Sequence, residues 1–203
     1  SHDQQASRLN WKNPGTFTLT EVNSPSWETN KGYEGNGTTS YLNTNFNLNT
    51  QGVNYVLNSA SVGIYLRLSA AASGNAELGA LDGSGRGPAI LSRFTADVFR
   101  GRINTVTNTT ATNTSTQGLF SASRTASNSQ DIYKNGVLQA NSSAASSVVP
   151  SLNLFLLAYN NNGSAAGYIA QQVSIAFISG GSINQLALYN AIQYYMASLS
   201  TQV

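Results

Sequence analysis

Residues 131–139 read DIYKNGVLQ, a short stretch that predicts two paired β-strands and the turn between them. Asn135 and Gly136 are of the types that supply the two positive φ angles of a type I′ turn. Two strand-like runs separated by such a pair are typical of a β-hairpin. We therefore predict a hairpin in which Lys134 pairs with Val137 and Tyr133 with Leu138.

The segment VGIYLRL at 62–68 alternates between two kinds of side chain, which predicts a strand. Tyr65 and Arg67 lie on one face of this strand, and we expect that face to meet solvent. The other face would pack in the core and carries Val62, Ile64, Leu66 and Leu68.

Further segments predict strands of a different character. Residues 93–103 hold apolar side chains among arginines, and we expect two short strands or one strand that is kinked at Gly101. The run LNLFLLAY at 152–159 is apolar on both faces, as in a central strand that is covered on two sides. A loop, NNNGSAAG at 160–167, would follow, and YIAQQVSIAFI at 168–178 would return as another strand.

The end of the chain predicts a single helix. Ser182 and Gln185 have the Ser-x-x-Gln spacing of a capping box. After them, six large side chains recur at the spacing of one helical face: Leu188, Tyr189, Ile192, Tyr195, Met196 and Leu199. We interpret this face as a packing surface and not as a ligand site.

Composition excludes several classes of function. The chain has 203 residues, enough for one sizeable domain, and only 9% of them are charged, so amides and hydroxyls should dominate the surface. The net charge is +2, and its one local concentration, at Arg93, Arg100 and Arg102, is too thin for nucleic-acid binding. Without cysteine the chain has no disulfide, thiolate nucleophile or Cys-based zinc site. No apolar run is long enough for membrane insertion.

The search for catalytic and metal-binding patterns predicts neither. The glycines of KGYEGNGTTSYLNTNF at 31–46 are not followed by the Lys-Ser/Thr pair of a phosphate loop, and they predict a turn that leads into a strand. The acids show no pair on one strand face of the kind that a glycosidase uses. The one histidine, His2, stands with Ser1 in what we interpret as a tag remnant. Single acids among amides, Glu34 and Asp82, are weak calcium candidates. We expect no catalytic residue, no metal and no cofactor.

Three segments carry a family resemblance. GYEGNGTTSYLNTNFN at 32–47, IYKNGVLQ at 132–139 and SIAFISGGSINQLALYNAIQYYM at 174–196 resemble concanavalin A-like (laminin G-like) jelly rolls. The resemblance covers residues 31–200 and implies an all-β, two-sheet antiparallel jelly-roll sandwich with one short C-terminal helix. The domain would span 31–203, and residues 1–30 would pack on it or lead into it. The Glu-x-Asp-x-x-Glu strand of the family's glucanases is absent.

The order of the segments further resembles tail and other virion proteins of bacteriophages. That resemblance implies a non-catalytic module on the virion surface, outside the cell, that binds bacterial surface polysaccharide. Aromatic rings would stack on sugar rings, and side-chain amides would form hydrogen bonds with the sugar hydroxyls. The candidate ligand-binding residues are Trp27, Tyr65, Arg67, Tyr159, Asn160, Asn161 and Asn162.

Two alternatives stay open at this point. In the first, the chain is a structural or decoration domain that packs against other virion subunits or forms a homo-oligomer, and the missing acid cluster favours it. In the second, it is a glycan-degrading enzyme, which rests on fold analogy alone.

Overall fold

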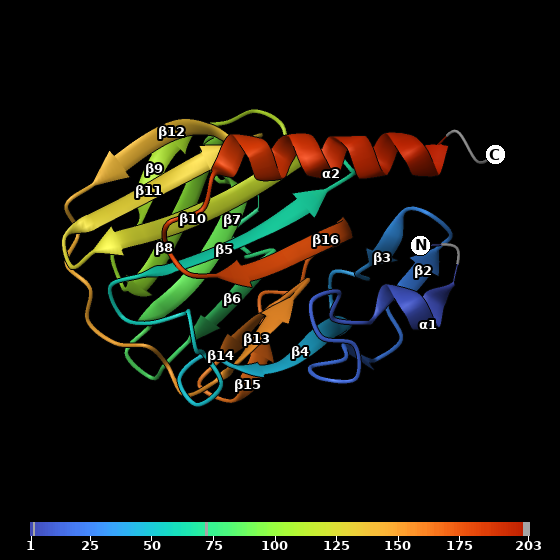
Figure 1. Cartoon of the computed structure of the whole chain (residues 1–203), viewed down its shortest axis with the longest axis horizontal. Helices are drawn as coiled ribbons and strands as arrows, with labels where there is room; N and C mark the ends of the chain where they lie inside the picture. Colours follow the sequence, from blue (N-terminus) through green and yellow to red (C-terminus); the bar gives the residue numbers. More distant parts are fainter. Residues whose placement is uncertain (2, 72, 201–203) are drawn as a thin grey trace.

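The computed structural model describes residues 1, 3–71 and 73–200, in which two β-sheets pack face to face beneath one long helix (Figure 1). The path of the nine-stranded sheet is β1 (Thr20–Val22), β4 (Tyr41–Asn47), β13 (Asn153–Leu156), β6 (Leu78–Leu81), β7 (Gly87–Phe94), β8 (Val98–Thr105) and β9 (Thr109–Thr112), with β14 (Tyr159–Asn161) and β15 (Ser164–Ala166) beside β6. The seven-stranded sheet follows the order β12 (Val137–Ser142), β11 (Ser129–Lys134), β10 (Gly118–Ala126), β5 (Ala60–Leu66), β16 (Gln172–Ser179), β3 (Gly32–Glu34) and β2 (Ser26–Glu28). Paired strands run antiparallel, apart from β14 and β6. The predicted all-β sandwich with a C-terminal helix is confirmed.

The core lies between the two sheets and is built from inward-facing residues of both. Leu42, Ile90 and Phe99 come from the nine-stranded sheet and are fully or almost fully buried. Phe120 of β10 meets Phe99 edge to face across the gap between the sheets, with ring centroids 5.1 Å apart. Burial of apolar side chains of this size contributes about 1.5–3 kcal/mol each, so this layer is the main source of stability.

The stretch at 31–46 forms a turn between the sheets, as predicted. It leaves the seven-stranded sheet at the end of β3 and enters the nine-stranded sheet as β4. Gly37 takes a φ of 74°, and a Cβ at Gly35 would lie 2.2 Å from the carbonyl oxygen of Ile169. The Asn36 Oδ1 closes the turn by accepting the backbone N–H groups of Thr38, Thr39 and Ser40.

The hairpin at 131–139 is confirmed in turn type and register. Asn135 and Gly136 have φ angles of 53° and 76° between β11 and β12. Lys134 is opposite Val137, and Tyr133 is opposite Leu138.

The face of β5 that carries Tyr65 is covered and does not meet solvent as predicted. Ser61 and Gly63 on this face are buried, and the ring of Phe177 lies over Gly63. The helix α2 (Gln185–Ser200) packs here, and Gln193 donates a hydrogen bond to the Tyr65 hydroxyl (Figure 1). Leu68, placed in the core by the alternation, lies beyond the end of β5 and is 37% exposed.

Residues 93–103 contain parts of two strands that form a hairpin. β7 ends at Phe94 and β8 begins at Val98, and Ala96 and Asp97 between them have positive φ angles. Gly101 does not kink β8, which was the predicted alternative. A Cβ there would lie 2.6 Å from Ile132 Cγ2, so the glycine lets the two sheets approach each other.

The apolar run at 152–159 is central, as predicted, but it is not one strand. β13 ends at Leu156, Leu157 takes a φ of 66°, and the chain turns back as β14. The segment predicted to be a loop then forms a second Asn-Gly hairpin, with Asn162 and Gly163 at φ 51° and 99° between β14 and β15. β16 begins at Gln172, four residues after the predicted start of that strand.

The helix α2 presents the predicted face to the sheet, with Ile192 buried at its centre. It begins at Gln185, and its N-cap is Asn184, whose Oδ1 accepts the N–H of Ala187. The predicted capping box with Ser182 is therefore wrong. The side chain of Gln185 is buried and instead bonds the hydroxyls of Ser121 and Ser61.

The N-terminal segment pairs with both sheets. β1 pairs with β4 and β2 with β3, and a four-residue helix, α1 (Gln4–Ser7), precedes them. His2 lies outside the described residues, so its interpretation as a tag remnant remains a prediction. Among the described residues, neither helix combines the length and the apolar character that a membrane span requires.

Candidate functional site

One row of side chains crosses the outer face of the nine-stranded sheet. Strand register places Asn43, Phe155, Gly79, Ala89 and Arg102 side by side on β4, β13, β6, β7 and β8. We call these five residues the outer row. Its centre, Gly79 and Ala89, has no side chain beyond Cβ, so larger neighbours can lie across it.

Four aromatic residues gather at the Asn43 end of the outer row: Tyr41, Phe155, Tyr159 and Tyr168. The ring of Tyr41 is 4.6 Å from that of Phe155 and 6.2 Å from that of Tyr168, centroid to centroid. Tyr159 packs against Gly167, where a Cβ would lie 2.4 Å from its ring. Phe155 is buried, whereas the three tyrosines are only partly buried. Parts of the three tyrosine side chains therefore reach solvent.

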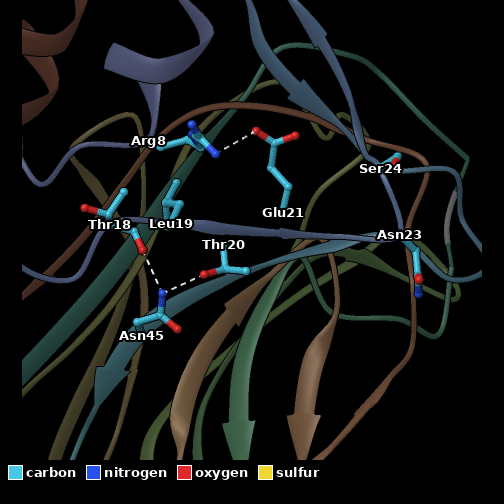
Figure 2. A pocket seen from close by; sticks show the side chains of 8 residues that line it. All are labelled: Arg8, Thr18, Leu19, Thr20, Glu21, Asn23, Ser24 and Asn45. Atoms are coloured by element: carbon cyan, nitrogen blue, oxygen red, sulfur yellow. Dashed lines mark hydrogen bonds and ion pairs between the residues drawn. The ribbon is translucent and has the colours of Figure 1, made fainter.

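A polar pocket of about 620 Å³ lies at the β1 edge of the same sheet (Figure 2). On one side the guanidinium of Arg8 is 3.7 Å from the carboxylate of Glu21, which also accepts a hydrogen bond from Tyr33. On the other side the amide of Asn45 donates to the Thr18 carbonyl and the Thr20 hydroxyl. Asn23 and Ser24 complete the rim. Thr20 is paired with Asn43, so the pocket continues the outer row.

The structure brings the predicted residues of 159–162 to this face. Tyr159 belongs to the aromatic cluster, and Asn161 and Asn162 are exposed at the hairpin tip beside it. Asn160 is buried, its Nδ2 donates to the Asn153 carbonyl, and its Oδ1 accepts the Gly163 N–H. The Asn160 side-chain amide therefore makes hydrogen bonds within the protein and is not available to a ligand.

The remaining predicted residues belong to the seven-stranded sheet and do not join Tyr159. Tyr65 lies beneath α2, and Arg67 follows β5 at its end. Trp27 packs against the core, and its buried indole N–H has no hydrogen-bond partner among the described residues. The seven residues thus do not form one surface.

Sequence reasoning missed that Tyr41, Tyr168 and Arg102 lie on the same face as Tyr159. Tyr41, Arg102 and Tyr159 belong to β4, β8 and β14, which are far apart along the chain and come into one sheet only through strand pairing. Burial raises the pKa of the Tyr41 hydroxyl, and nearby Tyr168 raises it further. The Tyr41 phenol therefore stays protonated at neutral pH and can donate a hydrogen bond.

Among the described residues, Glu77 is the carboxyl group whose pKa departs most from its ordinary value, but it is buried. Burial raises its pKa to about 7, and its two oxygens accept the N–H and the hydroxyl of Ser92 at 2.8 and 2.5 Å. Such a pKa can mark a general acid. Glu77 is only 3% exposed, so a substrate on the outer face does not reach it.

Metal-binding groups of three or more acidic, histidine or cysteine side chains are not found in the described part of the chain. Both acids considered for calcium have other surroundings. Asp82 is paired with Arg86, and Glu34 lies in β3 of the seven-stranded sheet.

A larger cavity of about 840 Å³ lies between the N-terminal segment, β4 and β16. Its lining is mainly apolar and includes Trp11, Phe17, Phe46 and Phe177. Such a lining suits an apolar group, whereas sugar hydroxyls need polar partners. Of the two cavities, the edge pocket is the one whose chemistry suits a sugar.

The chain matches no protein-family model and no curated protein. Its fold does match solved structures. The binding domain of botulinum neurotoxin serotype D has a TM-score of 0.62 at 8% identity, with 91% of this chain and 50% of that chain covered. The binding domain of botulinum neurotoxin DC in complex with SialylT has a TM-score of 0.60 at 12% identity, with 87% and 46% covered.

A mutant Trypanosoma rangeli sialidase that displays trans-sialidase activity is also similar, with a TM-score of 0.59 at 12% identity. The match covers 86% of this chain and 30% of that one. The chain therefore spans half or less of the length of these three proteins. At these identities the likeness shows the fold alone, a two-sheet antiparallel β-sandwich.

Proposed function

We propose that this chain is a non-catalytic carbohydrate-binding module. The observation that carries the proposal is the outer face of the nine-stranded sheet, where the partly buried Tyr41, Tyr159 and Tyr168 lie beside exposed amides and an edge pocket lined by hydroxyls and amides. Tyrosine rings supply flat apolar contact, and amides both donate to and accept from sugar hydroxyls. Two of the similar structures support it by their names, one in complex with SialylT and one with trans-sialidase activity.

The setting we propose is the surface of a bacteriophage particle, with bacterial surface polysaccharide as the ligand. The order of the strand segments supports this assignment through its resemblance to phage tail and virion proteins. In that setting the seven-stranded sheet, covered by α2, would face other virion subunits, while the nine-stranded sheet would face the host.

A structural role is the second candidate function, and a specific surface favours it. Val137, Leu138 and Leu186 are 57%, 47% and 51% exposed near the tip of the first hairpin and the start of α2. Apolar side chains gathered in this way can pack against another subunit. A decoration domain would use this surface and would bind no sugar.

Tyr159→Ala is expected to weaken glycan binding roughly 10- to 30-fold, as truncation of a well-placed aromatic commonly does. Affinity would be measured by calorimetry with the best ligand from a glycan array. Tyr65→Ala is the matched control, because it removes a tyrosine from the opposite sheet and should leave affinity unchanged. Loss of binding in Tyr65→Ala alone would move the site to the seven-stranded sheet. No binding of the wild-type chain to any glycan or bacterial cell would favour the structural role.

Chelation is expected to leave glycan affinity unchanged, because aromatic and amide contacts need no metal. The measurement is the same titration in EDTA and after addition of Ca²⁺. A loss in EDTA that Ca²⁺ restores would contradict the metal-free proposal.

A further inference from the structure

Two arginines stand on the outer face of β8, at the far end of the outer row from Asn43. Their neighbours Phe99, Gly101 and Ile103 are buried in the core, so Arg100 and Arg102 point outward by strand alternation. Arg102 lies opposite Ala89, and Arg100 lies opposite Leu91. Both are partly buried.

Both guanidinium groups are held in place by their surroundings. The guanidinium carbon of Arg100 is 3.5 Å from the centroid of the Phe94 ring, a cation–π contact. Arg102 donates from Nη1 to the carbonyl of Val106 at 2.9 Å. The Nε–H of each arginine is buried and has no hydrogen-bond partner among the described residues. Fixed guanidinium groups lose little side-chain entropy when a ligand binds.

Neither arginine is neutralised by a carboxylate in the described part of the chain. The nearby acids are engaged elsewhere, since Asp97 pairs with Arg93 and Asp82 with Arg86. Burial lowers the pKa of Arg102, yet a guanidinium stays charged at any physiological pH. The face therefore carries two positive charges that are available to an anion.

Arg102 is separated from the aromatic cluster only by Ala89 and Gly79, the small residues at the centre of the outer row. Arg102 is next to Ala89, Ala89 is next to Gly79, and Gly79 is next to Tyr159. Arg102 and Tyr159 are near enough to interact electrostatically. A sugar ring stacked on Tyr159 could thus place a charged substituent beside Arg102.

We infer that this face selects sugars that carry a negative charge. Arg102, assisted by Arg100, is the residue that binds the charged group. The inference rests on the proposed carbohydrate-binding function and names the substrate class. The planar fork of a guanidinium matches a carboxylate in two parallel hydrogen bonds, whereas a neutral hydroxyl cannot accept both with equal strength.

The test compares acidic sugars with their neutral counterparts. The probes are sialylated lactose beside lactose, and a glucuronic-acid oligosaccharide beside the corresponding glucose oligosaccharide. The wild-type chain is expected to prefer at least one acidic member by roughly tenfold or more, because hydrogen bonds to charged groups are the stronger class. Arg102→Gln should abolish that preference and leave the neutral affinity within about twofold.

Control variants distinguish specific recognition of the acidic group by Arg102 from loss of folding and from a change in net charge. Arg67→Gln removes one positive charge from the other sheet and should keep the preference, and Arg102→Lys, which keeps charge but loses the fork, should retain part of it. Urea midpoints identify any variant that fails to fold, and Arg100→Gln then serves as the second probe.

The outcomes distinguish this inference from the function on which it rests. Equal affinity of the wild-type chain for acidic and neutral sugars would overturn the inference while the binding function stands. A preference that survives in both Arg102→Gln and Arg100→Gln would also overturn it. If no sugar of either kind binds, the inference and the proposed function both fail.

Discussion

Replacing Gly136 with valine is expected to destabilise the protein by about 3 kcal/mol or more and to lower its urea midpoint accordingly. Gly136 has a φ of 76°, a conformation that a β-branched residue strongly resists. The structure adds a second cost. A Cβ at this position would lie 2.6 Å from Leu186 Cα and 2.9 Å from the Gln185 carbonyl oxygen, so the hairpin tip would push against the start of α2.

Gly163→Val is the matched control for this prediction. Gly163 follows Asn162 in the other Asn-Gly hairpin and has a φ of 99°, but a Cβ there would meet nothing within 4 Å. It should carry the cost of backbone strain alone. Comparable urea midpoints for the two variants would show that contact with α2 adds nothing, and an unchanged midpoint for Gly136→Val would mean that the turn is not formed.

The two Asn-Gly hairpins show how far sequence can predict this fold. The first was predicted in turn type and register, because strand-like runs flank Asn135 and Gly136. The second was predicted to be a loop, because Asn162 and Gly163 lie among amides and alanines whose strand propensity is low. β14 forms there through its pairing with β6, which is distant along the chain. The residues of the Asn-Gly turn determine its conformation, whereas β14 becomes a strand only because it pairs with a distant part of the chain.

The candidate site was predictable only in part, for a similar reason. Tyr159 and the amides after it are adjacent in sequence, so their proximity needed no knowledge of topology. Arg102 and Tyr41 join them through the register of five strands. Tyr65 was expected on an exposed face, but alternation along a strand cannot reveal that a helix from the end of the chain covers it.

Buried polar groups were the least predictable feature. Arg124 is fully buried and has no carboxylate partner among the described residues. Its guanidinium donates to the carbonyls of Ile103 and Ser127 and to the side chain of Gln130. Nothing in the local sequence around an arginine in a strand signals such a cage of acceptors. Glu77 belongs to the same class, and its burial has a measurable consequence.

Between about pH 4.5 and pH 7 the stability of the protein is expected to fall by roughly 3 kcal/mol as the pH rises. Burial raises the pKa of Glu77 to about 7 from its ordinary value of 4.5. In this window the folded chain therefore holds a proton that the unfolded chain has released. Stability that depends on this proton is complete below the unfolded pKa and is lost as the pH rises through the folded one.

Glu77→Gln should remove this pH dependence, because a neutral amide keeps a hydrogen-bonding partner for Ser92 and has no proton to lose. The measurement is the urea midpoint across the window in both forms, where the variant should be the more stable one above about pH 7. The comparison is best made in a His2→Ala background, since an imidazole titrates in the same range. Glu28→Gln, which removes an exposed acid paired with Lys31, should keep the wild-type slope. A slope that persists in Glu77→Gln would assign the dependence to another group and would mean that Glu77 is ionised inside the fold, held by the two hydrogen bonds from Ser92.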